Sequence, residues 1–318
     1  MPLTPFKKLN FDFNDFKVGT AEYKDAPTGC TLFAFPKPAT CLIDMRGGAC
    51  AVRESSSVDE VNTWGTIDAL MFAGGSSYGL EAADGLMKSL LKERKSTHFE
   101  HIPAVPAAII YDFSKRKEEL IYPDSKLGEE AYKNLKTNQI DIGRAGAGIN
   151  ATVGKYLGRD FSEYGGQGAA FINVGGIKLF AFTVLNSLGN IYNEKNEIIA
   201  GSLDPKTGRR VDLFKHRLNF HRNKKVPAKK ENTTISAIIT NAQLDRLSLK
   251  RLSIMVHTSM AQSIRPFHTP YDGDTLFAVS TQTKKMPIKL NVTDLSIIAA
   301  DLMNDAIHSI FSAHQNSK

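Results

Sequence analysis

The 318-residue sequence predicts an α/β (α+β) protein in which helices pack against the faces of β-sheets. Apolar runs of strand length recur along the chain and outnumber the few long amphipathic helices. Strands and helices do not alternate one for one, so the pattern does not indicate simple βαβ units. We find no internal repeat.

The first third of the chain predicts strands at residues 31–35, 41–45 and 68–73, each bounded by glycine, proline or polar residues. The polar segment 53–62 between the last two is predicted to be a surface excursion. A glycine-rich turn at 74–79 leads into an amphipathic helix. The apolar residues of that helix recur every three or four positions: Leu80, Ala83, Leu86, Met87, Leu90 and Leu91.

The middle of the chain predicts a buried strand at 107–113 that carries Tyr111, followed by a polar helix near 127–136. Glycine turns are predicted at 143–148 and 165–168, where small residues allow backbones to approach closely. A strong strand at 178–185 ends at Asn186. Several small-residue turns at strand ends suggest one convergent site, although tight connections in a compact sandwich would produce the same pattern.

The last third begins with a β-branched strand at Thr233, directly after a basic, polar segment. A helix is predicted at 247–264, with His257 and His268 framing its end. A strand follows at 275–280. The clearest amphipathic helix of the chain is predicted at 293–313.

The formal net charge of +7 does not indicate nucleic-acid binding, because it is confined to one segment. Residues 205–230 hold ten Lys or Arg and one acid, Asp212, so the rest of the chain is slightly acidic. The three cysteines, Cys30, Cys41 and Cys50, have no metal-binding spacing and are expected to be reduced. No apolar stretch approaches the roughly 18 residues of a membrane helix. Without a signal-peptide pattern, we expect a cytoplasmic protein that binds neither membrane nor nucleic acid.

Few motifs of known chemistry occur in the sequence. The HExxH motif of zinc proteases is absent. Asp272 and Asp274 flank one glycine near His268, and their carboxylates could bind a metal or orient a nucleophile. Without further ligands we expect no metal and no cofactor.

Thr233 is a candidate nucleophile if the bond between Asn232 and Thr233 is cut. A threonine hydroxyl needs a base to take its proton. The α-amine of an N-terminal threonine is such a base, with a pKa of about 7.7–8.0. From the residues alone, Thr233 could equally be the ordinary first residue of a strand.

Motifs spread from Phe11 onward resemble the autoprocessing amidohydrolase family of DmpA-type aminopeptidases and β-aminopeptidases. Within that family, the likeness is closest to the 6-aminohexanoate-oligomer (nylon-oligomer) hydrolases. The motifs follow the family order, and they are Pro27-Thr28-Gly29, Arg46-Gly47-Gly48, 74–82 (GGSSYGLEA), 110–114 (IYDFS), Tyr122-Pro123-Asp124, 143–148 (GRAGAG), 166–171 (GQGAAF), 232–241 (NTTISAIITN) and 266–279 (PFHTPYDGDTLFAV).

The resemblance implies a four-layer αββα sandwich like that of N-terminal-nucleophile hydrolases, with its own connectivity. It implies a single domain, 1–318, cleaved after Asn232 into a large subunit, 1–232, and a small subunit, 233–318. The basic loop 201–231 would precede the cleavage site. It further implies a homo-oligomer of cleaved heterodimers, commonly a tetramer.

The resemblance also assigns site residues. It places the nucleophile at Thr233, an acidic pair that orients it at Asp272 and Asp274, and a lysine at Lys155. The side chains of Asn186 and Tyr111 would donate hydrogen bonds to the oxyanion. Aminopeptidase relatives can carry Ser and Glu where this chain has Asp272 and Asp274, which favours the nylon-oligomer branch.

The implied function is hydrolysis of linear amides, such as 6-aminohexanoate oligomers or related peptides, through an acyl-enzyme on Thr233. An aminopeptidase acting on N-terminal D-, L- or β-residues is an alternative. A self-cleaving acyltransferase is another, because ornithine acetyltransferases also cut themselves at a threonine.

Overall fold

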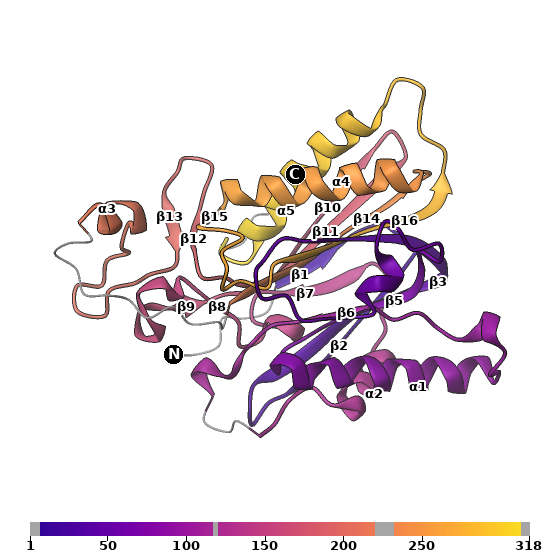
Figure 1. Cartoon of the computed structure of the whole chain (residues 1–318), viewed down its shortest axis with the longest axis horizontal. Helices are drawn as coiled ribbons and strands as arrows, with labels where there is room; N and C mark the ends of the chain where they lie inside the picture. The colour runs from indigo at the N-terminus through magenta and orange to yellow at the C-terminus, as the bar shows by residue number, and fades with distance from the viewer. Residues whose placement is uncertain (1–6, 117–119, 220–231, 313–318) are drawn as a thin grey trace.

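The computed structural model describes residues 7–116, 120–219 and 232–312. Their nine main strands are hydrogen-bonded in one continuous order that folds over into two facing sheets, and helices outside both sheets complete four layers (Figure 1). One sheet contains β10 (Gly166–Val174), β11 (Ile177–Asn186), β14 (Thr233–Ala242) and β16 (Thr275–Lys284). The other contains β2 (Lys17–Tyr23), β5 (Thr66–Ala73), β6 (Ala107–Ile109) and β4 (Val52–Arg53). The predicted αββα arrangement is therefore confirmed.

β3 (Thr28–Met45) belongs to both sheets. Its first half pairs with β2 and β5, and its second half pairs with β16. The register against β5 shifts between Ala34 and Ala39, where Pro36, Lys37 and Pro38 are exposed. The two separate strands predicted at 31–35 and 41–45 are thus one bent strand, because proline is tolerated where no ladder hydrogen bond is needed.

An aromatic core fills the space between the two sheets. Phe33 of β3 contacts Phe182 of β11 edge-to-face, with ring centroids 5.0 Å apart. Phe72 of β5 contacts Phe277 of β16 in the same way at 5.9 Å. Along β14, Ile235, Ala237 and Ile239 join this core, and Ile238 faces the opposite side of the sheet. This alternation is the period of two expected of a strand covered on both faces.

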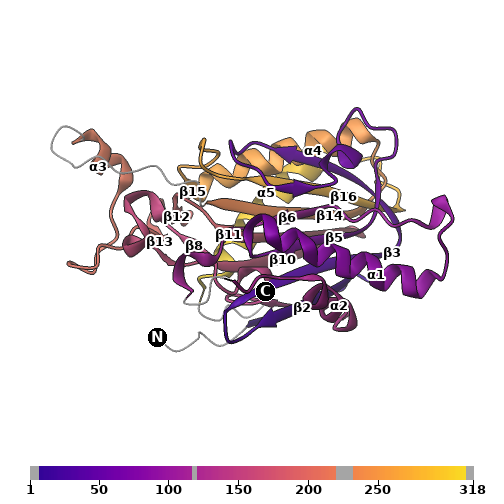
Figure 2. The ribbon, with the colours of Figure 1, turned by 60° about the horizontal axis from the view of Figure 1, so that its bottom comes forward.

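The outer helices cover the remaining sheet faces. α4 (Arg246–Ser259) and α5 (Val292–Ser309) pack on the β10–β16 sheet, and α1 (Ala82–Arg94) and α2 (Ser125–Lys133) on the other (Figure 2). α5 begins with a capping box in which Asn291 and Asp294 satisfy each other's backbone donors. Within the described part of the chain, no helix has the length and apolar character needed to span a membrane.

Several predicted boundaries were wrong. The glycines at 166–168 lie inside β10, where Gly168 is packed against the Ala306 carbonyl of α5. The strand predicted at 107–113 ends at Ile109, and a 3-10 turn follows at Phe113–Lys115. α4 stops at Ser259, before a 3-10 turn at Met260–Gln262. The segment 53–62 is less exposed than predicted, because Val58 is fully buried.

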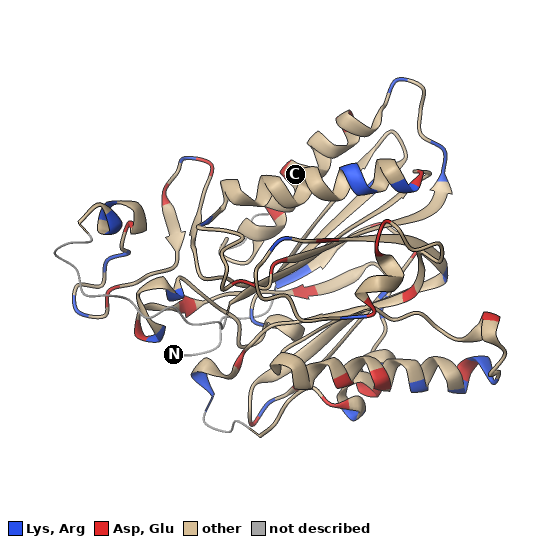
Figure 3. Cartoon of the chain, viewed as in Figure 1, with Lys and Arg blue, Asp and Glu red and all other residues tan. Residues whose placement is uncertain are grey.

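The described part of the basic loop, residues 201–219, carries the short helix α3 (Leu213–Leu218) and extends from the sandwich (Figure 1). Beside it lies a small sheet of β12 (Asn190–Tyr192), β13 (Ile198–Ala200) and β15 (Ile264–Arg265). Figure 3 shows Lys and Arg on α3 and the loop before it, whereas most of the sheet carries no charge. Residues 220–231 of the predicted basic loop lie outside the described residues. The small sheets β1 (Lys7–Asn10) with β7 (Gln139–Ile142), and β8 (Thr152–Val153) with β9 (Glu163–Tyr164), complete the fold.

Candidate active site

Thr233 is the first residue of β14, which lies between antiparallel β11 and parallel β16. It is 7% exposed and lies directly opposite Asn186, the last residue of β11. Asn232, just before it, forms a parallel bridge with Asp272. The peptide bond predicted to be cut is therefore held in regular extended backbone at the end of a central strand.

Two donors contact the carbonyl oxygen of Asn232. The Thr233 Oγ1 hydroxyl donates to it at 2.5 Å, and the Gly273 backbone N–H donates at 2.9 Å. Gly273 has no side chain to separate these groups: a Cβ there would lie 2.8 Å from Thr233 Oγ1. The amide of Gly273 therefore polarises the carbonyl beside which the candidate nucleophile lies.

Asp274 is fully buried and fixes the backbone after Thr233. Its Oδ1 accepts a hydrogen bond from the Thr234 N–H at 2.8 Å. Its Oδ2 accepts one from the His268 N–H at 2.9 Å and contacts His268 Nδ1 at 3.1 Å. Both carboxylate oxygens are thus occupied, which holds the side chain in one orientation.

Asp272 faces the turn between β11 and β12. Its Oδ1 accepts from the Leu188 N–H at 3.2 Å, and its Oδ2 from the Thr269 hydroxyl and from the Thr269 N–H at 3.3 Å. Burial, with repulsion from Asp274, raises the pKa of Asp272 to about 6 despite the opposing effects of these hydrogen bonds and of Lys155. Its charge therefore changes in the mildly acidic range.

Lys155, Asn186 and Tyr111 form one connected group. Lys155 Nζ donates to the Asn186 backbone carbonyl at 2.7 Å and to Asn186 Oδ1 at 2.8 Å. Asn186 Nδ2 donates to the Tyr111 carbonyl at 3.0 Å. Asn186 Oδ1 thus accepts hydrogen bonds from Lys155 and from the Thr152 N–H, while Nδ2 donates to the backbone of Tyr111.

The structure brings all the predicted site residues to one end of the β10–β16 sheet, but two contacts differ from expectation. Asp274 holds the Thr234 amide instead of the Thr233 side chain. One N–H of the Asn186 side chain is directed to a backbone carbonyl. The Tyr111 hydroxyl lies 3.5 Å from Arg159 Nη2, a partner that sequence reasoning missed.

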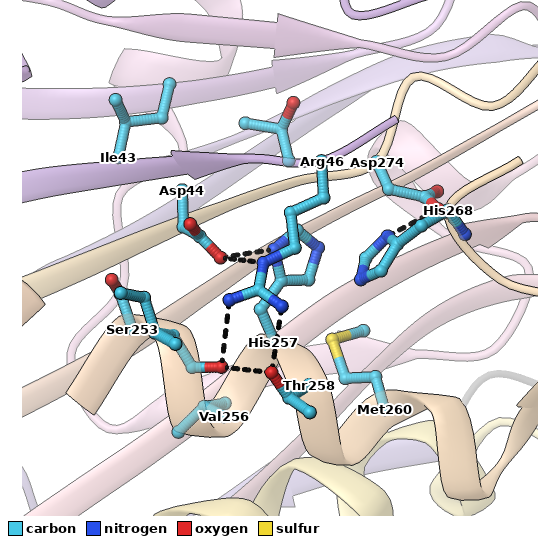
Figure 4. A network of polar contacts seen from close by, with 12 residues as sticks. Ile43, Asp44, Arg46, Ser253, Val256, His257, Thr258, Met260, His268 and Asp274 are labelled. Atoms are coloured by element: carbon cyan, nitrogen blue, oxygen red, sulfur yellow. Dashed lines mark hydrogen bonds and ion pairs between the residues drawn. The ribbon is translucent and has the colours of Figure 1, made fainter. Parts of the chain in front are cut away.

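Sequence reasoning also missed the network behind Asp274 (Figure 4). His257 of α4 contacts Asp44 of β3 through Nδ1 at 2.9 Å, and its ring lies edge-to-face with His268 at 4.4 Å between centroids. Arg46 also binds Asp44, at 2.7 Å. The two histidines framing the helix end were the only sequence signal of this network. In the part of the chain that the structure describes, no three His, Cys, Asp or Glu side chains are grouped to hold a metal.

Comparison with known proteins gives a family match over nearly the whole chain. The model of peptidase family S58 matches residues 11–317. A 6-aminohexanoate-oligomer endohydrolase from Kocuria sp. (strain KY2) is 38% identical over 310 residues, which cover 94% of this chain and 84% of the relative. An uncharacterized aminopeptidase from Mycobacterium bovis is 30% identical over 282 residues, covering 83% and 76%.

A solved structure supports the fold. The L-aminopeptidase D-Ala-esterase/amidase from Ochrobactrum anthropi, described as a new variant among the Ntn hydrolase fold, superposes with a TM-score of 0.68. The alignment covers 96% of this chain and 88% of that one, with 16% sequence identity. This likeness concerns the arrangement of layers alone.

Proposed function

Because the chain belongs to peptidase family S58, we propose that it cuts itself between Asn232 and Thr233 and then uses Thr233 as the nucleophile of amide hydrolysis. The chain is a hydrolase of that family and acts on amide bonds. The observation that carries the proposal is the pair of donors on the Asn232 carbonyl, the Thr233 hydroxyl and the Gly273 amide.

Self-cleavage would proceed as an N-to-O acyl shift. Thr233 Oγ1 attacks the Asn232 carbonyl carbon, and the Gly273 N–H stabilises the negative charge that develops on the oxygen. The C–N bond breaks, and the nitrogen leaves as an amine that carries the hydroxyl proton. Water then hydrolyses the ester, which releases the Asn232 carboxyl group and regenerates the Thr233 hydroxyl.

In the cleaved protein, the new α-amine of Thr233 would take the hydroxyl proton during attack on a substrate amide. Lys155 would disfavour a second positive charge nearby and so keep that amine neutral. The Asn186 amide and the Tyr111 hydroxyl would donate to the substrate oxyanion. Asp272 and Asp274 would hold the loop and strand on either side of the nucleophile.

The proposed substrates are linear amides of ω-amino acids or short peptides, since a relative is named for endohydrolysis of 6-aminohexanoate oligomers. The alternative is release of N-terminal residues, because other relatives are named aminopeptidases. A 6-aminohexanoate hexamer with a blocked amine separates the two. Internal fragments would support endohydrolysis, and loss of all cleavage on blocking would support an aminopeptidase. Acyl transfer to an added amine that outruns hydrolysis would support an acyltransferase.

Denaturing mass spectrometry of the wild type beside Thr233→Ala tests the proposal. We expect two chains, 1–232 and 233–318, from the wild type and one 34.9 kDa chain from T233A. Thr233→Ser keeps a hydroxyl and should cleave. An intact wild-type chain, with hydrolysis surviving in T233A, would overturn the proposal. We further propose a single domain that assembles into a homo-oligomer of cleaved heterodimers, which native mass spectrometry tests.

A further inference from the structure

Two buried carboxylates, Asp44 and Asp274, are joined through two histidine rings. Asp44 lies on β3 and Asp274 just before β16, and each contacts the Nδ1 atom of one ring. His257 and His268, which supply these atoms, lie edge-to-face with centroids 4.4 Å apart (Figure 4). The other end of Asp274 holds the amide of Thr234, next to the candidate nucleophile. The chain of contacts therefore runs from α4 to the Thr233 strand.

The protons on these rings follow from the acceptors around them. His257 and Arg46 hold the pKa of Asp44 at about 2, although burial acts in the opposite direction. Asp44 is thus ionised and can only accept, so Nδ1 of His257 carries a proton. Both oxygens of Asp274 already accept hydrogen bonds from backbone N–H groups, so Nδ1 of His268 is assigned as a further donor to Oδ2. Each ring is then neutral unless Nε2 is also protonated.

The two Nε2 atoms have no hydrogen-bond partner among the described residues, although both are buried. A second proton on one ring would place a full charge beside its neighbour, which opposes protonation of the other ring. Burial, and then the charge of His268, lower the pKa of His257 against the raising effect of Asp44. The charged groups that face the pair or its carboxylates are Asp44, Arg46, Lys250, Asp272, Asp274 and Lys155.

We propose that His268 is a positioning residue for Asp274 and that it shares a single proton with His257, so that acid places one positive charge behind Asp274. This inference rests on the proposed role of Thr233. The charge would attract the Asp274 carboxylate and so hold its hydrogen bond with the Thr234 amide in acid. Loss of either ring would then narrow the acid side of the pH range of hydrolysis.

His268 adopts a left-handed backbone with φ of 56°. Asparagine tolerates that conformation and offers an N–H near the position of histidine Nδ1, but it does not titrate. His268→Asn therefore separates hydrogen bonding from proton uptake, and His268→Ala removes both. His257→Asn makes the same change at the second ring. His98, which is exposed and contacts the ring of His101, supplies a control, His98→Asn.

The first experiment follows the His257 ring by NMR in uncleaved Thr233→Ala protein. Adding His268→Asn should move proton uptake at His257 to higher pH by about one unit, because repulsion from the second ring is lost. Adding His98→Asn should leave it unmoved. An unchanged His257 titration in the His268→Asn protein would refute the shared proton. This measurement needs no activity, so it stands even if self-cleavage fails.

The second experiment compares kcat and KM across pH in the self-cleaving background. His268→Ala should lower kcat about tenfold with little change in KM, and His268→Asn should recover most of that loss. In both His257→Asn and His268→Asn, the acid limb of kcat/KM should move to higher pH than in His98→Asn. Equal loss of kcat in the Asn and Ala variants, or acid limbs that coincide with that of the control, would overturn the positioning role.

Discussion

Asn186 lies directly opposite Thr233 across the antiparallel pair of β11 and β14. The Lys155 ammonium donates hydrogen bonds to both oxygens of Asn186. Asn186 therefore links the lysine to the strand position that faces Thr233. Asn186 also holds the carbonyl of Tyr111. One amide residue thus connects the strand end, the buried cation and the segment that carries the tyrosine.

Gly273→Ala should block self-cleavage in an otherwise folded chain. Its Cβ would meet Thr233 Oγ1 at 2.8 Å and the Ala49 carbonyl at 2.9 Å, which displaces the hydroxyl from the Asn232 carbonyl. Denaturing mass spectrometry over time should show intact chain. Gly208→Ala is the control for backbone strain alone, since a Cβ there meets nothing within 4 Å and the only cost is an alanine at a φ of 66°. Cleavage of Gly273→Ala at the wild-type rate would contradict the assigned geometry.

Lys155→Met should reduce kcat about a hundredfold. The variant lacks the buried positive charge that we propose keeps the Thr233 α-amine neutral and able to act as a base. Leaving the Asn186 oxygens with fewer donors should also cost about 1–3 kcal/mol of unfolding free energy. Steady-state kinetics and urea unfolding measure the two effects. Lys88→Met, on the exposed face of α1, is the matched control. Equal activity of Lys155→Met and Lys88→Met would show that Lys155 has no role in catalysis.

Asp272→Asn should change how stability depends on pH. The pKa of Asp272 is raised to about 6 in the folded state from an ordinary value of 3.8. Its contribution is therefore fully present below 3.8 and is lost as pH rises through 6. Urea unfolding of Thr233→Ala should show this loss relative to Thr233→Ala/Asp272→Asn. Parallel curves for the two proteins between pH 4 and pH 7 would show that Asp272 titrates normally.

Asp112→Ala should destabilise the fold by about 3–5 kcal/mol, because it removes the carboxylate that pairs with the buried guanidinium of Arg116. Asp112 and Arg116 contact at 3.1 Å with both side chains fully buried. Asp112 also accepts from the Thr28 hydroxyl and the Gly75 N–H. Replacing both partners, in Asp112→Leu/Arg116→Met, should recover part of the loss. Chemical unfolding is the measurement, and a double variant less stable than Asp112→Ala would contradict this account.

The sequence pattern predicted those strands and helices whose structure is determined by residues close together in the sequence. The start of β14 at Thr233 follows from its β-branched run, and the amphipathic repeat of α5 gave its position within a few residues. β3 was predicted as two strands because Pro36 and Pro38 resemble a break in sequence. The glycines of β10 resembled a turn, although their role is close packing against α5.

Some site residues could likewise be predicted from the local sequence, whereas others depend on strand register or on packing. Asp272 and Asp274 adjoin one strand start, so their proximity was legible in the sequence. Asn186 faces Thr233 only because of strand register, and the resemblance supplied that residue. The contact between Asp44 and His257 spans 213 positions and depends on how α4 lies over β3. No local rule relates those two residues.

The central position of β14 affects whether the protein can refold after it is unfolded. If the chain is cut before Thr233, two polypeptides share one sheet. β14 then pairs with β11 of the large subunit and with β16 of its own, small subunit. The intact precursor folds as one molecule, whereas the cut protein could refold only by the meeting of two chains at finite concentration. Unfolding of the cut protein by heat or denaturant would then be irreversible at low protein concentration, where the uncut Thr233→Ala chain refolds.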